Sequence, residues 1–558
     1  MDWIPFGVCS GRHSRSVLSR RGLAWWLYLV ASTNDSAWSH CVFWYWLLEP
    51  GVRINIPNAW DKIGPDYAVF AVYSWGCGNA CCLLYERVEI VLQTHLLYPG
   101  SFSNNGYCSV FLEDAVNMRI GLIAMSGIRV CDSELLRLGL TLPGFVERSK
   151  TIASLPSLGL LTLAALTPSN HDVQYIEMPD LPQGENIPGD FDLIAISSYS
   201  AQIDEAYELA QRYRRKGIPV LMGGPHVTVL PDEALQFCDA VVIGEGEPCW
   251  PEVLQDAERF ALKKRYGSRK SNYDLADSPV PSFELLDISK YNRLTVQTSR
   301  GCPHRCEFCA SSVILTEKYK QKPVSNVLAE IDRIFTIWKH PFIEFADDNS
   351  LVDRAYWKEL LKHFKSKGIR WFAETDLSVA QDEDLLDLMR DSGCAQVLIG
   401  LESPVEAGLH ELELSNDWKL KQFSHYRDAI ATIQSHGITV NGCFIIGLDG
   451  HTPDIFDQVF SFVRTAKLYE VQITIMTPFP GTPLYARMES EGRLIEPRNW
   501  KKCTLFDINF RPAGMSVEQL HDRFKKLVVE LYSEEFTNWR RHTFKESLRQ
   551  RRQKGASS

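Results

Sequence analysis

Three cysteines stand close together in one short segment of the chain, Cys302, Cys306 and Cys309. They form the pattern C-x3-C-x2-C in the segment 300–309, which reads RGCPHRCEFC. Three thiolates in one loop can bind three irons of a cubane iron–sulfur cluster. The fourth iron then has no protein ligand and is open to a small molecule. The segment therefore predicts a metal-dependent redox site with one open coordination position.

Two alternatives compete with this interpretation, a structural zinc site and a chance grouping of cysteines. Structural zinc takes four ligands, usually as paired C-x2-C motifs, and no second pair lies nearby, although His304 could complete a set. The adjacent Gly301 and Pro303 indicate a loop, where a buried cysteine has no reason to lie. The chain has fifteen cysteines, and an odd total with one tight cluster favours metal binding in a reducing compartment over a disulfide framework.

Polar residues and glycines follow several predicted strands downstream of the cysteines. Asp347 and Asp348 follow the apolar run 342–345, Glu402 and Ser403 follow 396–400, and Ile446-Gly447 ends the run 439–446. Chemistry at the carboxyl ends of parallel strands is the general rule for such sheets. Each carboxylate could instead be a helix cap or a solvated loop residue, but their recurrence after successive strands favours one shared site.

A second group of small and polar residues lies upstream, again after predicted strands. Its members are Ser197, Ser198, Gly223, Gly224, His226, Glu245, Gly246 and Glu247. Glycines in such loops let the backbone approach a ligand, and an open parallel sheet binds ligands beyond its strand ends. The alternative is that these glycines only make turns. The first predicted strand is not followed by G-x-G-x-x-G, so we do not expect a nicotinamide cofactor.

Short apolar strands that alternate with helical patterns predict an α/β fold with two parallel sheets. The first sheet takes strands at 119–124, 173–177, 191–196, 218–222 and 240–243. The second takes strands at 294–298, 342–345, 371–373, 396–400, 439–446 and 471–476, separated by helical patterns. Six β/α units are too few for a closed eight-fold barrel, so we expect a six-stranded partial barrel of the TIM type.

Composition sets the broad class of the protein. The chain has 558 residues, of which 45 % are hydrophobic and 23 % charged, as in an ordinary globular protein. This excludes a disordered, collagen-like or polytopic membrane chain. The net charge of −10 argues against a broad nucleic-acid surface. We expect a Rossmann-like domain at 118–262, a linker at 263–285, the partial barrel at 286–485, a helical region at 486–548 and a basic disordered tail at 549–558.

The first 117 residues differ from the rest. They are rich in tryptophan, show no sustained period of 2 or 3.6, and contain no unbroken apolar run of about 20 residues that a membrane span requires. An unusual folded extension is one interpretation. We favour another: Met118 begins a normal first strand, so residues 1–117 are translated upstream sequence and the working protein starts at Met118.

The motifs together resemble a known family. The cysteine pattern, with Phe308 before the last cysteine, is similar to the radical SAM superfamily. The upstream stretches 155–161, 223–226 and 242–247 resemble the cobalamin-binding domain that precedes many radical SAM enzymes. The motif D-x-H-x-x-G is absent, and His171 looks like an ordinary loop histidine, so no histidine can be assigned as a lower ligand of cobalt.

The resemblance implies the cofactors and the site. Cys302, Cys306 and Cys309 would hold a [4Fe-4S] cluster that cleaves S-adenosylmethionine (SAM) reductively. The residues Phe308, Asp347, Asp348, Glu402, Ser403, Ile446 and Gly447 would contact SAM, and the eight upstream residues named above would contact cobalamin. The implied activity is methyl transfer to an unactivated carbon or phosphorus of a small-molecule or lipid-like substrate.

The resemblance also implies partners and leaves alternatives. It implies a flavodoxin- or ferredoxin-type electron donor, a cytoplasmic location, and neither nucleic acid nor a membrane span. A radical SAM enzyme of another type, for ring closure or rearrangement with a vestigial cobalamin domain, is the first alternative. A non-catalytic cobalamin- or redox-sensing protein and a zinc-binding interaction protein are the others.

Overall fold

The structure is a computed structural model, and it describes residues 117–138, 155–184, 186–311 and 318–555 in full. The chain divides into two compact units, Met1–Ala115 and Val116–Ser558. In the first unit only six short strands are described, and they pair antiparallel as β1 with β2, β3 with β4, and β5 with β6. Their bounds are β1 Trp26–Ala31, β2 Ser39–Trp44, β3 Val69–Tyr73, β4 Ala80–Leu84, β5 Ile90–Gln93 and β6 Tyr107–Val110. The prediction about the origin of residues 1–117 otherwise lies outside the described residues.

The second unit begins with a six-stranded parallel sheet, in the order β12-β11-β10-β9-β7-β8. The strands are β7 Arg119–Met125, β8 Asp172–Met178, β9 Leu193–Ser197, β10 Val220–Gly223, β11 Ala240–Gly244 and β12 Arg265–Ser268. The helices are α1 Ser133–Arg137, α2 Leu158–Leu166, α3 Ile203–Arg215, α4 Pro225–Val229, α5 Pro231–Ala234 and α6 Trp250–Glu258. Separate apolar cores lie on the two faces, one with α3 and one with α2 and α6. The predicted Rossmann-like arrangement is confirmed, and strand order reverses between β7 and β9.

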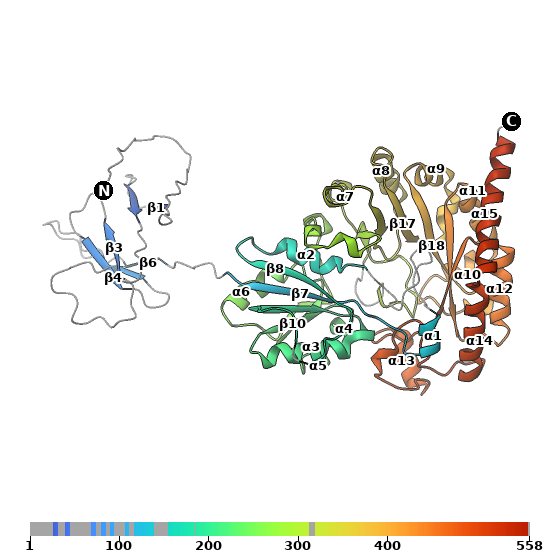
Figure 1. Cartoon of the computed structure of the whole chain (residues 1–558), viewed down its shortest axis with the longest axis horizontal. Helices are drawn as coiled ribbons and strands as arrows, with labels where there is room; N and C mark the ends of the chain where they lie inside the picture. The colour runs from blue at the N-terminus through green and yellow to red at the C-terminus, as the bar shows by residue number, and fades with distance from the viewer. Residues whose placement is uncertain are drawn as a thin grey trace. The chain divides into compact units, whose positions relative to one another are not determined.

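A second six-stranded parallel sheet follows in sequential order, β13-β16-β17-β18-β19-β20. Its strands are β13 Leu294–Val296, β16 Phe342–Phe345, β17 Arg370–Thr375, β18 Cys394–Glu402, β19 Thr439–Ile446 and β20 Glu470–Ile475. The helices between and beside them are α7 Val324–Ile337, α8 Arg354–Phe364, α9 Glu383–Asp391, α10 Trp418–Gln422, α11 Tyr426–Ser435 and α12 Ile455–Thr465. Figure 1 shows α7, α8 and α9 on the outside of this curved sheet. The edge strands β13 and β20 do not pair with each other, so the predicted partial barrel is confirmed.

Helices dominate the C-terminal part, as predicted. They are α13 Pro483–Ser490, α14 Val517–Leu531 and α15 Glu534–Gly555. A capping box between Ser516 and Gln519 begins α14, and α14 packs its apolar side, including Leu520 and Phe524, into the barrel core. Among the described residues, none of the helices has the length and apolarity needed to cross a bilayer.

Two predicted segments differ from the structure. Residues 265–268, expected to lie in a linker, form β12 and pair parallel with β11. The buried Tyr266 of this strand joins the core on the α6 side, which a run of charged neighbours concealed in the sequence. The tail expected to be disordered from residue 549 continues α15 as far as Gly555. Charged residues such as Arg and Lys are good helix formers, so a basic composition did not end the helix.

Candidate functional site

The cysteine loop leaves the first barrel strand and is held on both sides. After β13 the chain forms β14, Ser299–Arg300, which pairs antiparallel with β15, Lys320–Gln321. The loop then runs beside residues 412–414: Glu307 N donates to Leu412 O at 2.9 Å, and Leu414 N donates to Arg305 O at 2.7 Å. A carboxylate–guanidinium pair, Glu307 with Arg487 of α13 at 2.6 Å, fixes its far end. The sequence therefore places the three cysteines on an anchored loop at the carboxyl edge of the barrel.

All three thiols are free, and Cys306 is the buried one. Burial raises the pKa of Cys302 to about 11, and it raises the pKa of Cys306 against the opposing charge of Lys419. Nowhere among the described residues do three Cys, His, Asp or Glu side chains converge on one point. Ligands of three different irons stand farther apart than ligands of one ion, so a loop with three free thiols fits a cluster by its donor chemistry.

His304, which could have completed a zinc set, points to protein partners instead. Its Nε2 lies 3.2 Å from Asp376, and its Nδ1 lies 3.5 Å from Glu413. Its ring packs on Trp418, with the centroids 4.5 Å apart. The imidazole therefore connects the cysteine loop to the loops that follow β17 and β18.

Asp347 and Asp348 both hold the cysteine loop. Asp347 is buried and accepts hydrogen bonds from Thr298 N at 2.7 Å, Thr298 Oγ1 at 2.6 Å and Ser299 N at 2.9 Å. Asp348 accepts from Gly301 N at 2.7 Å and from the Ser311 hydroxyl. Both carboxylates therefore shape the cysteine loop from its two ends, and their predicted contact with SAM stays a prediction.

Glu402 is the last residue of β18 and Ser403 follows it, and each has a partner that the sequence did not indicate. Glu402 adopts a left-handed backbone conformation, with φ +61°, and its carboxylate pairs with Lys419 of α10 at 2.7 Å. Burial lowers the pKa of Lys419, but the charge of Glu402 and its hydrogen bond outweigh burial and raise the pKa. Ser403 Oγ lies 3.0 Å from Nε2 of the buried His451. A cation thus stands between the cysteine loop and the end of β18.

The remaining predicted SAM residues lie where expected, at the edge of the barrel. Ile446 ends β19 and is buried. Gly447 follows with φ +97°, and a Cβ there would come within 2.8 Å of Phe510 Cζ. Only glycine fits this left-handed, crowded position without strain. Phe308 is partly buried and packs against the barrel core, so it anchors the cysteine loop to that core.

The inner face of the barrel keeps accessible surface around one acidic side chain. Glu374 of β17 is exposed there and is paired in register with Leu398; Gly400 pairs in register with Cys443, and these three residues are partly accessible. Desolvation, together with the charges of Glu344, Asp348 and Asp347, raises the pKa of Glu374 to about 8. Among the described residues its carboxyl group has no side-chain partner, so it is free to face a ligand inside the barrel.

Four predicted cobalamin residues meet at the carboxyl edge of the first sheet. Ser197 is aligned with Gly223 across β9 and β10, and with Ala124 across β9 and β7. Ser198 follows it, and Gly224 (φ +102°) approaches Ser198 O so closely that a Cβ would lie at 2.8 Å. These residues therefore lie at the reversal of strand order, where such sheets bind ligands, and their small side chains and hydroxyl groups fit a nucleotide-like tail.

Glu245 and Glu247, also predicted to contact cobalamin, join the first sheet to the β14–β15 hairpin of the barrel. Arg300 of β14 donates to Glu245 at 2.9 Å and also to Glu247. Lys320 of β15 pairs with Glu245 at 2.8 Å. The glutamates are almost fully buried, and Gly246 between them lets the loop pack on Leu163. The acidic loop after β11 thus clamps the residue that stands two positions before Cys302.

His226 is also committed within the protein. Its Nδ1 lies 3.0 Å from Ser200 Oγ and its Nε2 lies 3.1 Å from Glu233. Burial raises the pKa of Glu233, but hydrogen bonds from His226 and Arg498 outweigh it and lower the pKa to about 2. His171 lies directly before β8 and contacts Met118 N and Glu258. Neither histidine is free to bind a metal.

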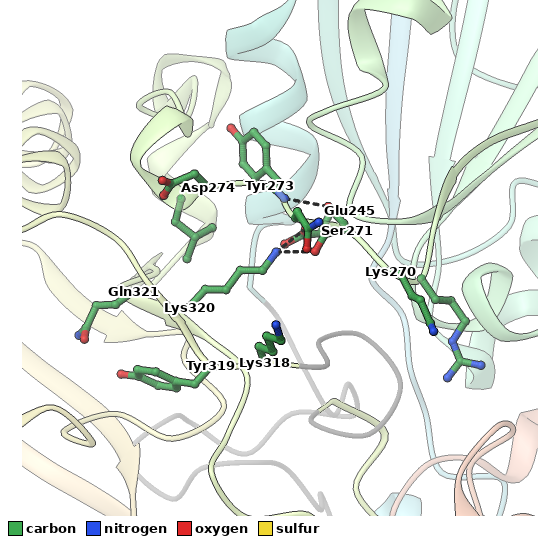
Figure 2. A pocket seen from close by; sticks show the side chains of 12 residues that line it. Glu245, Lys270, Ser271, Tyr273, Asp274, Lys318, Tyr319, Lys320 and Gln321 are labelled. Atoms are coloured by element: carbon green, nitrogen blue, oxygen red, sulfur yellow. Dashed lines mark hydrogen bonds and ion pairs between the residues drawn. The ribbon is translucent and has the colours of Figure 1, made fainter.

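A pocket of about 530 Å³ lies beside the clamp, between the two sheets (Figure 2). One wall is the segment 269–275 after β12, and the other is the segment 318–321 that includes β15. Figure 2 shows Lys320 reaching across to Glu245, with Lys318 below it and Lys270 to the right. The pocket therefore adjoins the hairpin that carries the cysteine loop.

Several residues that shape the site were missed from the sequence. They are Arg300, Lys320, Glu374, Lys419, Asp376 and His451. Only Arg300 carried a signal, since a charged residue directly before Gly301-Cys302 has to find a partner. Lys419 lies in a helix of five residues with no strand beside it, so nothing in the sequence connects it to Glu402.

Comparison with known proteins follows the same division of the chain. Residues 296–463 match the family model of the radical SAM superfamily, and residues 151–254 match the B12 binding domain. Residues 482–558 match a domain of unknown function, DUF4070. The cysteine loop and the acidic loop after β11 both fall inside the two matched domains of known type.

Two curated relatives and one solved structure extend the comparison. The bacteriochlorophyllide d C-12(1)-methyltransferase of Chlorobaculum tepidum is 29 % identical over 388 residues, 67 % of this chain and 82 % of the relative. The hopanoid C-2 methylase of Rhodopseudomonas palustris is 27 % identical, over 62 % of this chain and 67 % of the relative. The radical SAM methyltransferase TsrM from Kitasatospora setae, with cobalamin and a [4Fe-4S] cluster bound, shares the fold with TM-score 0.51 and 15 % identity, covering 68 % of this chain and 76 % of that one.

Proposed function

Because the chain is a radical SAM enzyme with a cobalamin-binding domain, we propose that it methylates an unactivated carbon or phosphorus atom of its substrate. When bound, the cluster supplies the electron that cleaves SAM, and cobalamin carries the methyl group. The observation that carries the proposal is the placement of Cys302, Cys306 and Cys309 on an anchored loop, clamped through Arg300 to the carboxyl edge of the first sheet. That clamp brings the two cofactor domains to one reaction space.

Within this proposal the chain's own residues position the reactants. The three cysteines hold the cluster, and Asp347 and Asp348 hold their loop. Glu402, Ser403, Ile446 and Gly447 would contact SAM from the neighbouring strand ends. Positioning of this kind converts a reaction between separate molecules into one within a single complex, and the protein's contribution is orientation and exclusion of water.

The substrate and its surroundings are part of the same proposal. Glu374, which has no side-chain partner among the described residues, would face a small or lipid-like molecule on the barrel's inner face. A flavodoxin- or ferredoxin-type protein supplies the electron that reduces the cluster, and no nucleic acid takes part. Oxygen degrades a cluster that has an open iron, so we propose that the enzyme works in the reducing cytoplasm.

The experiment uses the full chain, purified without oxygen and reconstituted with iron and sulfide. It is incubated with methyl-deuterated SAM, hydroxocobalamin and dithionite, and mass spectrometry follows 5′-deoxyadenosine and deuterated products. A shift in the visible absorption bands of hydroxocobalamin reports its binding. We expect binding, and 5′-deoxyadenosine that disappears in the Cys306→Ala variant; protein that holds its cluster and binds SAM but never cleaves it contradicts the proposal.

One observation favours a second candidate, a radical SAM enzyme for ring closure with an empty first domain. Three of the predicted cobalamin residues, His226, Glu245 and Glu247, are used in protein contacts. The anaerobic magnesium-protoporphyrin IX monomethyl ester cyclase of Rubrivivax gelatinosus is 24 % identical over 55 % of this chain and 59 % of the relative. This candidate predicts SAM cleavage without any shift in the hydroxocobalamin spectrum, which separates it from methylation.

A further inference from the structure

The pocket beside the clamp lies away from the reversal of strand order, although Glu245, which is also a predicted cobalamin residue, lines it. Its walls come after β12 and from β15, whereas the reversal of strand order lies between β7 and β9. Three strands, β9, β10 and β11, separate β12 from β7 in the sheet. A ligand at the reversal point therefore leaves this pocket, at the edge of the sheet, open to another partner.

Three cations, Arg269, Lys270 and Lys318, form what we call the basic rim of the pocket. All three are exposed, and in the described part of the chain their charged groups form no ion pair or hydrogen bond with another side chain; the Ser268 hydroxyl bonds only to the backbone carbonyl of Lys270. The chain as a whole carries a net charge of −10, so this local excess of positive charge runs against its general character. Because the three cations stay hydrated and stand apart from the buried Lys320–Glu245 pair, they suit a broad acidic surface better than one small enclosed anion.

The basic rim is connected to the cysteine loop by a short structural path. Lys320 pairs in register with Arg300 across β14 and β15, and paired antiparallel residues lie about 5 Å apart between Cα atoms. Arg300 precedes Cys302 by two residues, which span at most about 7 Å. The pocket wall therefore lies within about 12 Å of Cys302, close enough for a docked protein to bring a redox centre near the cluster.

We propose that the basic rim is the docking surface for an acidic one-electron donor protein, such as a reduced flavodoxin. This inference rests on the proposed function, since it presumes a cluster at the three cysteines. In the step itself one electron leaves the donor's reduced flavin and reduces the oxidised cluster by one electron, and no atom is transferred. Complementary charges mainly raise the rate at which two proteins associate, and salt weakens this attraction.

The test compares two reductants on the reconstituted full chain. Reduced flavodoxin is an acidic protein, and photoreduced 5-deazariboflavin is a small uncharged donor; the loss of visible cluster absorbance gives the rate of reduction for each. The variant is Arg269→Glu/Lys270→Glu. Its matched control is Arg215→Glu/Lys216→Glu, an exposed Arg-Lys pair at the end of α3. Iron content and circular dichroism check that both variants keep the cluster and the fold, and direct titration of flavodoxin measures its affinity for each.

We expect the rim variant to be reduced by flavodoxin at least about tenfold more slowly at low ionic strength, with weaker flavodoxin binding. The difference should shrink as salt is added, and the control variant and the deazariboflavin rates should match wild type. An unchanged flavodoxin rate, or equal slowing with both reductants, overturns the proposal, as does a wild-type rate independent of salt. Failure of the wild-type protein to cleave SAM with either reductant would instead count against the proposed function.

Discussion

Removal of the Arg300 side chain tests whether the clamp between the two sheets is structural. Its guanidinium contacts Glu245 at 2.9 Å and also Glu247, with Arg300 17 % exposed and the glutamates 8 % and 7 % exposed. An Arg300→Met variant would remove the ion-pair partner of the buried Glu247 and leave Glu245 with Lys320 and Ser271. Breaking a buried pair from one side typically costs about 3–5 kcal/mol, so we expect a loss of unfolding free energy in that range.

A double-mutant cycle measures the coupling free energy between Arg300 and Glu247. Glu247→Gln alone should cost about 1–3 kcal/mol, and the double variant should cost less than the two single variants together, with a coupling of about 1–3 kcal/mol. Urea unfolding followed by circular dichroism measures each variant. The control is Arg265→Met, which removes the pair with Asp232 whose side chains are 45 % and 83 % exposed; it should cost at most about 1 kcal/mol. An Arg300→Met cost no larger than this control would refute the reasoning.

Three further perturbations test the site. Asp347→Asn replaces the carboxylate oxygen that accepts from the Thr298 and Ser350 hydroxyls with an NH2 group, so we expect reconstituted protein to hold less iron by direct assay than wild type; equal iron content would contradict a loop-holding function. Gly447→Ala should destabilise the protein by about 1–3 kcal/mol in urea, and more than Gly437→Ala, because both glycines are left-handed but only Gly447 lies against another side chain; equal costs would argue against the contact with Phe510. Burial lowers the pKa of His451 to about 4, so the folded protein binds fewer protons than the unfolded chain and stability should fall as pH drops from about 6.5 to 4; His451→Gln should lessen that fall in urea midpoints, and an identical pH profile would be the contrary result.

The fold was readable from the sequence wherever burial on both faces of a parallel sheet makes strands apolar. The runs at 342–345 and 439–446 became β16 and β19 with the predicted bounds. β12 was missed because only Tyr266 of its four residues is buried, so an edge strand among charged residues looks like a linker. The short helix α4, which follows Gly224 directly, leaves no periodic pattern to detect.

The site was readable only in part, because function there depends on which loops meet. Spacing along the chain was enough to single out Cys302, Cys306 and Cys309. It could not show that Glu245 meets Arg300, since 55 residues separate them, nor that Asp347 faces the backbone of the cysteine loop. Pairings between loops of different β/α units follow from the three-dimensional arrangement of the strand ends, which a single sequence does not encode in any local pattern.

The most direct test of the account is 5′-deoxyadenosine formation by the anaerobically reconstituted full chain, with SAM and a low-potential reductant, quantified by mass spectrometry beside Cys306→Ala. The account predicts product from wild type and none above background from the variant. Iron-loaded, SAM-binding wild-type protein that forms no product, or equal product from both proteins, would contradict it.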